Sequence, residues 1–337
     1  MSSDTNGLQQ LLETRYGLIG ELERLLGERD RNYRLKADSG QSYVVKIVDA
    51  DESELTSDFQ IQALRHLERK ECAVAVPRVV NTTGGDFAAS IDVGGERRIV
   101  RVVTWVPGSP MSDVELDEHL ARELGVALAS VDKELADFRH TAERRDLAWD
   151  MQNAGRLRQR TAHIADRRIR QKVAACFDVF VDEIEPRFSS IRHQVIHSDL
   201  NPANVLVTSG PRLSIAGIID FSDMVRAPLV VDVAIAASYL RSATEDALEL
   251  IAPFVAGFNS VVALEEAELN LLYDLVQTRL ATTITMKFWR AATAGKDDPY
   301  LAQTMDSERD AEDFLIRLGD LSRSAFAGRI RASISDL

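Results

Sequence analysis

The sequence predicts an α+β protein in two lobes, a strand-rich N-terminal lobe and a mainly helical C-terminal lobe. Strand-like patterns dominate residues 32–106, and helical patterns dominate after residue 110. The segment Pro107-Gly108-Ser109-Pro110 separates them, and clustered proline and glycine interrupt both helices and strands. We therefore expect an N-terminal lobe over residues 1–103, a hinge over 104–108 and a C-terminal lobe over 109–337.

The N-terminal lobe begins with a predicted β-hairpin. Residues 32–37 and 42–48 alternate like strands and flank the turn Asp-Ser-Gly-Gln at 38–41. Apolar residues at helical spacing then predict a helix over residues 55–67. Strand patterns return over residues 78–106, interrupted by two Gly-Gly pairs.

The C-terminal lobe opens with one long apolar stripe, which predicts a helix that Ser112 and Asp113 would cap. Two strand-like stretches follow, near Val195 and Ile215, and the rest reads as helical. The stripe consists of Leu116, Leu120, Leu124, Leu128, Val131, Leu135 and Phe138, and the later helices are expected over 232–240, 248–258 and 265–289.

Composition indicates a globular protein and excludes several classes. The chain has 337 residues, of which 45% are hydrophobic and 28% charged, and its net charge is −13. This charge argues against a nucleic-acid partner and suits a cationic substrate, although solubility alone would explain it. The two cysteines, Cys72 and Cys176, form no disulfide or zinc pattern, and no apolar run is long enough to span a membrane. We expect a cytoplasmic protein without a targeting segment or a membrane partner.

Two short polar segments carry the chemistry. The segment from His197 to Asn204 reads His-Ser-Asp-Leu-Asn-Pro-Ala-Asn between two apolar runs, and Asp220 ends a third run. A turn at 209–211 can fold residues 205–207 against 213–219 as an antiparallel pair, which makes Asn204 and Asp220 neighbours. An amide and a carboxylate oxygen, with other positions left to water and phosphate, suit magnesium.

Asp199 would lie in the same loop, where its carboxylate can accept the proton of a substrate hydroxyl. Lys46 is the candidate phosphate-binding lysine. It alternates in phase with Val44 and Val48 in a predicted strand, so we expect it on a largely apolar face, where a surface lysine is seldom found. A lysine that extends its ammonium to solvent is the alternative. Phosphoryl transfer depends mainly on positioning and charge neutralisation, which these four residues would supply.

The two segments resemble motifs of a known superfamily. His197–Asn204 and Ile219–Asp223 are similar to the HxDxxxxN and IDxxD motifs of the aminoglycoside phosphotransferase and choline kinase superfamily, a branch of the protein-kinase-like fold. Asp220–Met224 followed by Asp232–Ala236 looks closest to the hydroxylysine kinase group. Arg31-Asn32-Tyr33, Lys46 and Trp105-Val106-Pro107-Gly108 also fit that group.

The resemblance implies a role for each matched residue. Asp199 would be the catalytic base, Asn204 and Asp220 the Mg²⁺ ligands, and Lys46 the contact to the α- and β-phosphates of ATP or GTP. The backbone of Thr104, Trp105 and Val106 would meet the nucleotide base, which makes the N-terminal lobe the nucleotide-binding lobe. His197 would brace the catalytic loop, and Asp232 would cap its helix.

The chain departs from the family pattern at three places. Gln60 stands where the lysine's glutamate partner is usual, and Asp58 and Glu54 are alternative partners. The phosphate-covering loop at 27–33 has no glycine-rich pattern, so side chains would replace backbone amides there. Ser198 and Ser222 stand where many relatives carry glycine. The candidate phosphate contacts in the loop are Arg29, Arg31 and Asn32, and an ordinary turn is the alternative for each.

The resemblance also implies a small-molecule kinase whose acceptor lies over the helical lobe. Asp223 would bind an amine of the acceptor, or else cap a segment or bind metal through water. Trp289 would wall a cation pocket, or else pack in the core.

The leading acceptor is an amino alcohol or hydroxylated amino acid such as 5-hydroxylysine. The alternatives within the same class are aminoglycoside or macrolide antibiotics, homoserine and choline. An alternative of a different class is a nucleotide-binding pseudokinase module. The sequence leaves three questions open: whether the donor is ATP or GTP, what the oligomeric state is, and whether the chain is part of a larger multidomain protein.

Overall fold

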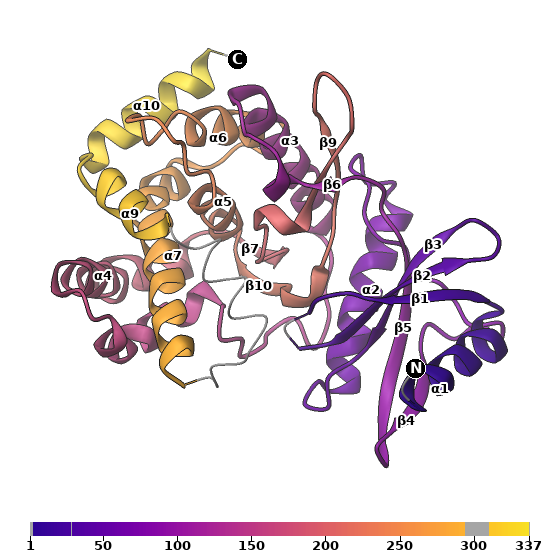
Figure 1. Ribbon diagram of the computed structural model, residues 1–337. Coiled ribbons are helices and arrows are strands. Elements are labelled where there is room, and N and C mark those ends of the chain that lie inside the picture. The colour runs from indigo at the N-terminus through magenta and orange to yellow at the C-terminus, as the bar shows by residue number, and fades with distance from the viewer. Residues whose placement is uncertain (1–2, 28, 294–309, 337) are drawn as a thin grey trace.

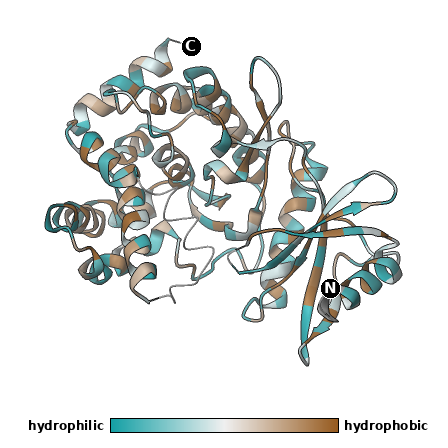
Figure 2. Ribbon diagram, viewed as in Figure 1, coloured by the Kyte–Doolittle hydropathy of each residue, from teal (hydrophilic) through white to brown (hydrophobic). Residues whose placement is uncertain are grey.

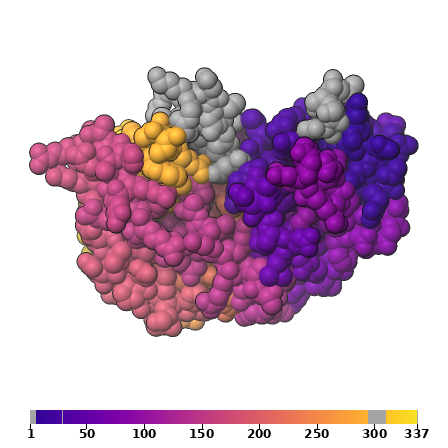
Figure 3. All heavy atoms as spheres, turned by 90° about the horizontal axis from the view of Figure 1, so that it is seen from below, coloured from indigo at the N-terminus to yellow at the C-terminus, as the bar shows by residue number. Residues whose placement is uncertain are grey.

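The computed structural model describes residues 3–27, 29–293 and 310–336 and shows two lobes (Figure 1). The N-terminal lobe, indigo to purple, contains a five-stranded antiparallel sheet, and the remainder is mainly helical. Seen from below, the two lobes lie side by side (Figure 3). The predicted α+β architecture is confirmed.

The N-terminal sheet has the strand order β1-β2-β3-β5-β4. The predicted hairpin is confirmed as β2 and β3, and the predicted helix as α2. Between α2 and β4, residues 78–88 form only an isolated bridge from Val79 to Val103, so the predicted strand region begins later than expected. The elements are α1 (Ser3–Leu11), β1 (Gly20–Arg24), β2 (Arg31–Ala37), β3 (Ser42–Ile47), α2 (Glu54–Arg69), β4 (Ala89–Val93) and β5 (Glu96–Thr104).

The two faces of this sheet have different functions. Tyr33, Val45 and Val102 lie on the face that packs against α1 and the turn after it, in a small separate core. Lys46 lies on the opposite face, where its cross-strand neighbours are Asn32 and Arg101. Lys46 shares this face with Val44, as expected, and Val103 lies opposite Val44, but the cross-strand neighbours Asn32 and Arg101 make the face mixed and not largely apolar.

The C-terminal lobe is a helical assembly with two small sheets. Its helix α5 is buried along its whole length and is the mainly brown helix at the centre of the lobe in Figure 2. The predicted long helix is α3, but its cap is Asp117, which accepts a hydrogen bond from the Leu120 amide, and not Ser112 or Asp113. The strands are β6 (Ser109–Pro110), β7 (His193–Ile196), β8 (Val205–Val207), β9 (Ile215–Ile218) and β10 (Val225–Pro228). The helices are α3 (Glu118–Leu135), α4 (Arg167–Val179), α5 (Leu229–Ser238), α6 (Ile251–Asn259), α7 (Glu266–Thr293), α9 (Ala311–Gly319) and α10 (Arg323–Ser335).

Within the described part of the chain, no helix is both long enough and apolar enough to traverse a lipid bilayer.

Helices α3 and α6 cross closely because each presents a glycine to the other. A Cβ at Gly125 would overlap the backbone of Phe254 and Phe258, and a Cβ at Gly257 would overlap the carbonyl of Arg122. This contact anchors α3, which also packs against β7 and β9 beneath the polar segments.

We predict that Gly125→Ala lowers the free energy of unfolding by about 1–3 kcal/mol, because the added methyl group must push two packed backbones apart. Urea unfolding measures the change. Gly328→Ala on the exposed side of α10 is the control, since no atom lies within 4 Å of its Cβ and alanine favours a helix. Equal stabilities of the two variants would contradict the close crossing.

Candidate active site

A cleft of about 1530 Å³ lies between the two lobes. Lys46 lines it from the N-terminal lobe, and Asp199, Asn204 and Asp220 line it from the C-terminal lobe. The four side chains that the sequence singled out from separate segments therefore face one cavity.

The β8–β9 pair brings Asn204 and Asp220 together. Val205 pairs with Ile218, and the amide of Ile219 donates a 2.9 Å hydrogen bond to the carbonyl of Asn204. The predicted antiparallel fold-back at 209–211 is thus confirmed, and it sets the residue before β8 beside the residue that follows β9.

The loop that carries Asp199 is held by a buried carboxylate. Asp232 accepts hydrogen bonds of 2.8 Å from the amides of both His197 and Ser198. Ser198 has φ +67°, a conformation that favours glycine, so the serine is held in a strained backbone. Asp232 therefore supports the loop that carries Asp199. The sequence had suggested that it caps its own helix, but α5 has no side-chain cap.

His197 braces the loop from the other side. Its Nε2 lies 3.0 Å from the carbonyl oxygen of Ile219, and its ring meets Phe221 edge-on at 4.8 Å. The imidazole therefore links the Asp199 loop to the Asp220 segment, which is the bracing role expected from the sequence.

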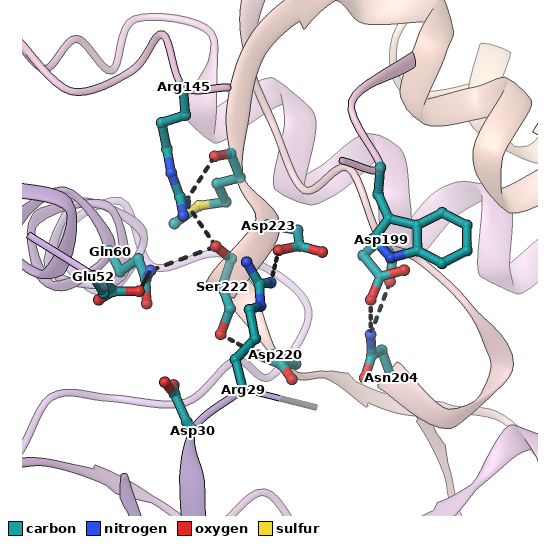
Figure 4. A network of polar contacts seen from close by, with 12 residues as sticks. Arg29, Asp30, Glu52, Gln60, Arg145, Asp199, Asn204, Asp220, Ser222 and Asp223 are labelled. Carbon is teal, nitrogen blue, oxygen red and sulfur yellow. Dashed lines mark hydrogen bonds and ion pairs between the residues drawn. The ribbon is translucent and has the colours of Figure 1, made fainter. Parts of the chain in front are cut away.

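Asp199 is oriented by the amide side chains of Asn201 and Asn204, and Figure 4 shows the contact with Asn204. Its Oδ2 accepts hydrogen bonds from Asn204 Nδ2 at 2.9 Å and from Asn201 Nδ2 at 3.1 Å, and its Oδ1 lies 3.7 Å from Arg279 Nη2. Burial, and after it the negative charge of Asp223, raise the pKa of Asp199 to about 8, although the Arg279 guanidinium opposes the shift. A carboxylate with this proton affinity suits a general base.

Lys46 reaches across the cleft to Asp220, the aspartate that the sequence predicts as a Mg²⁺ ligand. Its Nζ lies 2.9 Å from Asp220 Oδ1 and 3.1 Å from Ser222 Oγ, and Ser222 Oγ donates to the same Oδ1 at 2.6 Å. Burial raises the pKa of Asp220, but Lys46 and Ser222 outweigh it and hold that pKa well below its usual range. Asp220 is therefore ionised at neutral pH.

The oxygens around Asn204 and Asp220 fit a magnesium ion. The Asn204 amide nitrogen is directed at Asp199, which leaves its carbonyl oxygen for a ligand, and the lysine and serine hydrogen bonds to Asp220 both fall on Oδ1. The described residues contain no cluster of three or more His, Cys, Asp or Glu side chains suited to a metal. One amide and one carboxylate agree with magnesium, which keeps waters and phosphate oxygens as its other ligands.

The partner of Lys46 differs from all three alternatives raised by the sequence. Gln60 instead accepts a 2.6 Å hydrogen bond from Arg101 Nη1 and donates to Glu52 at 3.1 Å. Asp58 pairs with His140, and Glu54 begins α2. The lysine thus contacts Asp220 and Ser222, while Gln60 joins a buried cluster beside them.

The phosphate-covering loop reaches the opposite lobe through a side chain. Arg29 forms an ion pair with Asp223, next to Ser222 and Asp220 (Figure 4). Arg29 and Asn32 line the cleft, whereas Arg31 is not among its lining residues. Arg145 supports the same segment by donating to the carbonyl of Ser222 at 2.7 Å.

The hinge backbone is partly committed to the sheet. The amide of Thr104 donates to Arg78 and that of Trp105 donates to Ser42. Among the described residues, the Val106 amide donates no backbone hydrogen bond outside regular helices and strands. Contact of this backbone with a nucleotide base stays a prediction, and the Val106 amide is its strongest candidate.

The two acceptor residues predicted from the sequence have protein partners. Asp223 is mostly buried in its pair with Arg29, and the Trp289 ring stacks with Arg160 at 3.9 Å and does not line the cleft. The part of the cleft beyond Asp199 is lined by residues that no local motif marks. They are Trp149, Tyr239, Arg241, Arg279, Thr283, Lys287 and Arg290.

Comparisons with known proteins agree with this geometry. Residues 21–268 match the phosphotransferase enzyme family. The chain is 25% identical over 316 residues to hydroxylysine kinase of Bos taurus, covering 87% of this chain and 84% of that protein. A solved microcompartment-associated aminopropanol kinase aligns at 21% identity with a TM-score of 0.72, over 97% of this chain and 99% of that chain. An amicoumacin kinase in complex with AMP-PNP, Ca²⁺ and Ami aligns at 16% identity with a TM-score of 0.69, over 93% and 94%.

These likenesses confirm the predicted kinase-like fold and the predicted superfamily.

A second buried carboxyl lies behind Asp232. Asp132 of α3 is 1% exposed and interacts with Asp232, which is fully buried. Burial raises the pKa of both, and the neighbouring Asp232 adds to the rise for Asp132. A protonated Asp132 can donate to Asp232, which in turn accepts from the catalytic loop.

We predict that the free energy of unfolding of Asp132→Asn, relative to that of the native protein, rises from pH 5 to pH 8. Because folding raises the pKa of Asp132, its protonated form contributes stability that is complete below about pH 4 and is lost as the pH rises toward the folded-state pKa. An amide can donate to Asp232 without this loss. Urea unfolding at several pH values measures the gap, with exposed Asp146→Asn as the control for removing a carboxylate. A gap that shrinks as pH rises would contradict the assignment.

Proposed function

Because the chain belongs to the phosphotransferase enzyme family, we propose that it transfers the γ-phosphoryl group of ATP or GTP to a hydroxyl of an amino alcohol or a hydroxylated amino acid. The observation that carries the proposal is the convergence of Lys46, Asp199, Asn204 and Asp220 on one cleft. Each group matches a requirement of phosphoryl transfer, which depends on positioning and charge neutralisation.

Asp199 acts as the general base. Two amide groups fix its Oδ2, so its carboxylate has one orientation relative to the cleft. In our proposal the acceptor hydroxyl donates its proton to Asp199 while its oxygen attacks the γ-phosphorus. The leaving nucleoside diphosphate carries away the electron pair of the broken bond.

Lys46, Asn204 and Asp220 hold the donor. The lysine ammonium binds phosphate oxygens, and Asn204 with Asp220 would hold Mg²⁺. When bound, Mg²⁺ neutralises charge on the transferring phosphoryl group. Arg29 lies in the phosphate-covering loop beside Asp220 and supplies a further cation at the same place.

The acceptor class rests on the relatives. One relative is named hydroxylysine kinase and one structural neighbour aminopropanol kinase, and both names describe a hydroxyl on a small amine. The cleft is large enough for a nucleotide and such an acceptor together.

We predict nucleotide-dependent phosphorylation of at least one small hydroxylated amine, and a loss of about 10²–10⁴-fold in kcat for Asp199→Asn. A screen of hydroxylated amino acids, amino alcohols, aminoglycosides and sugars, each with ATP and GTP, measures the activity. Nucleotide binding, followed by thermal shift, should survive the substitution. Turnover of antibiotics or sugars alone would change the acceptor class, and binding without turnover of any acceptor would favour a nucleotide-binding module.

We further predict that Asp220→Asn abolishes the magnesium-dependent part of nucleotide binding. In the native protein, ATP with Mg²⁺ should raise Tm more than ATP with EDTA, because a bound ligand stabilises the folded state. In the variant, the two shifts should be equal. Asp146→Asn removes a carboxylate from the same cleft and is the matched control. A magnesium effect that persists without Asp220 would exclude this residue as a ligand.

A further inference from the structure

The Ser222 hydroxyl contacts both charged groups at the centre of the cleft. Ser222 Oγ donates a 2.6 Å hydrogen bond to Asp220 Oδ1 and accepts one of 3.1 Å from Lys46 Nζ. Lys46 Nζ also donates to the same Oδ1 at 2.9 Å, so the three groups form a closed triangle of hydrogen bonds. These contacts to the carboxylate both fall on Oδ1, which leaves Oδ2 of Asp220 for another ligand.

The backbone of Ser222 is held from both lobes. Its carbonyl oxygen accepts a hydrogen bond of 2.7 Å from Arg145 Nη1 and one of 3.4 Å from Gln60 Nε2 (Figure 4). Gln60 belongs to α2 of the N-terminal lobe and is 3% exposed, whereas Arg145 belongs to the segment that follows α3 in the C-terminal lobe. Because these contacts hold the main chain, the hydroxyl keeps a constant position relative to Asp220.

Asp220 depends on such a contact for its orientation. Its side chain is 41% exposed, so packing alone does not fix the carboxylate. Its backbone has φ +59°, a region that residues other than glycine seldom adopt, immediately before the short turn Phe221–Asp223. This turn brings the Ser222 hydroxyl back to the carboxylate. The hydrogen bond from Ser222 therefore ties the Asp220 side chain to a turn whose backbone is already held.

Lys46 cannot keep all of its present contacts once a nucleotide binds. An ammonium has three N–H donors, and two of them are directed at Asp220 and Ser222. In the proposed reaction the same ammonium binds phosphate oxygens, and two such contacts would leave a single donor for its present partners. The Ser222 hydroxyl lies on the same turn as Asp220 and has no second task of this kind, so it can continue to hold Oδ1.

We propose that Ser222 is a positioning residue for Asp220: its hydroxyl holds Oδ1, so that the other carboxylate oxygen stays available to Mg²⁺ while Lys46 turns to the nucleotide. This inference rests on the proposed kinase function and adds a residue to it. Ser222 itself binds neither the metal nor the substrate, and it acts only through the carboxylate beside it. Its removal should therefore weaken the binding of Mg²⁺ and leave unchanged the contacts that do not depend on the metal.

A Mg²⁺ titration of Ser222→Ala tests the proposal. At a fixed ATP concentration and without an acceptor, Tm is followed as Mg²⁺ is raised, because a bound ligand stabilises the folded state. We expect the Mg²⁺ concentration that gives half of the rise in Tm to increase about 3- to 10-fold, the range for one lost hydrogen bond. Ser222→Thr restores the hydroxyl and should give the native value, since a cavity of about 40 Å³ beside Ser222 has room for the added methyl group. An unchanged Mg²⁺ dependence in Ser222→Ala would overturn the proposal.

A matched variant and a metal-free measurement assign the effect to Asp220. Ser112→Ala removes a serine hydroxyl from the same cleft, but this hydroxyl donates to Asp113 at 3.1 Å, so the Mg²⁺ dependence should stay native. An equal change in Ser112→Ala would argue against a specific role of Ser222. With ATP and EDTA, the rise in Tm should be the same in Ser222→Ala as in the native protein. A smaller rise would show that the hydroxyl supports Lys46 and its nucleotide contacts, and would overturn the inference.

Steady-state kinetics separate positioning from a merely structural role. With an active acceptor, Ser222→Ala should raise the apparent KM for Mg²⁺ by the same factor and leave the KM for the acceptor unchanged. Saturating Mg²⁺ should then restore most of kcat, because the metal site is weakened and not destroyed. A kcat that stays low at saturating Mg²⁺ would indicate a structural defect and overturn the positioning role. If no acceptor is phosphorylated, the kinase proposal fails, whereas the Tm measurements still decide the role of Ser222.

Discussion

The site depends on the short antiparallel pairing of β8 with β9. The 2.9 Å hydrogen bond from the Ile219 amide to the Asn204 carbonyl fixes Asn204 beside Asp220. Asp232 then fixes the start of the same loop through two amides, and His197 joins it to the carbonyl of Ile219. A change in register at β8 would move Asn204 away from both Asp199 and Asp220, so backbone pairing precedes every electrostatic property of the cleft.

The second constraint is the repulsion of three carboxylates in one cavity. Asp199, Asp220 and Asp223 all line the cleft, and like charges that are partly shielded from water destabilise one another unless cations lie nearby. Each has a cation from a different part of the fold, Arg279 from α7, Lys46 from β3 and Arg29 from the phosphate-covering loop. Two of these three cations belong to the N-terminal lobe, so neutralising the site also joins the lobes.

The sequence predicted those parts of the site that are local in the chain. The loop from His197 to Asn204, the fold-back onto Asp220 and the hairpin with Lys46 all have turn or alternation signals within a few residues. Arg279 has no such signal, because it lies within a helix pattern about 80 residues after Asp199 and looks like any helical arginine. For the same reason the lysine's contact with Asp220 was not expected, since a side-chain partner across a cleft depends on how the lobes pack.

Arg279 links the loop that carries Asp199 to helix α7. The side chain that neutralises part of the charge of Asp199 also lines the cleft. The rings of Trp149 and Tyr239 hold it from two sides, so little side-chain entropy remains to be lost when a substrate binds. The side of the cleft that carries Lys46, Asn204 and Asp220 is built from paired charges on short loops and strands, whereas the side that carries Arg279 is built on the long buried helix α7. The arrangement of Asp199, Asn204 and Asp220 therefore depends on β8, β9 and their loop, and substitutions along the cleft face of α7 leave that pairing in place.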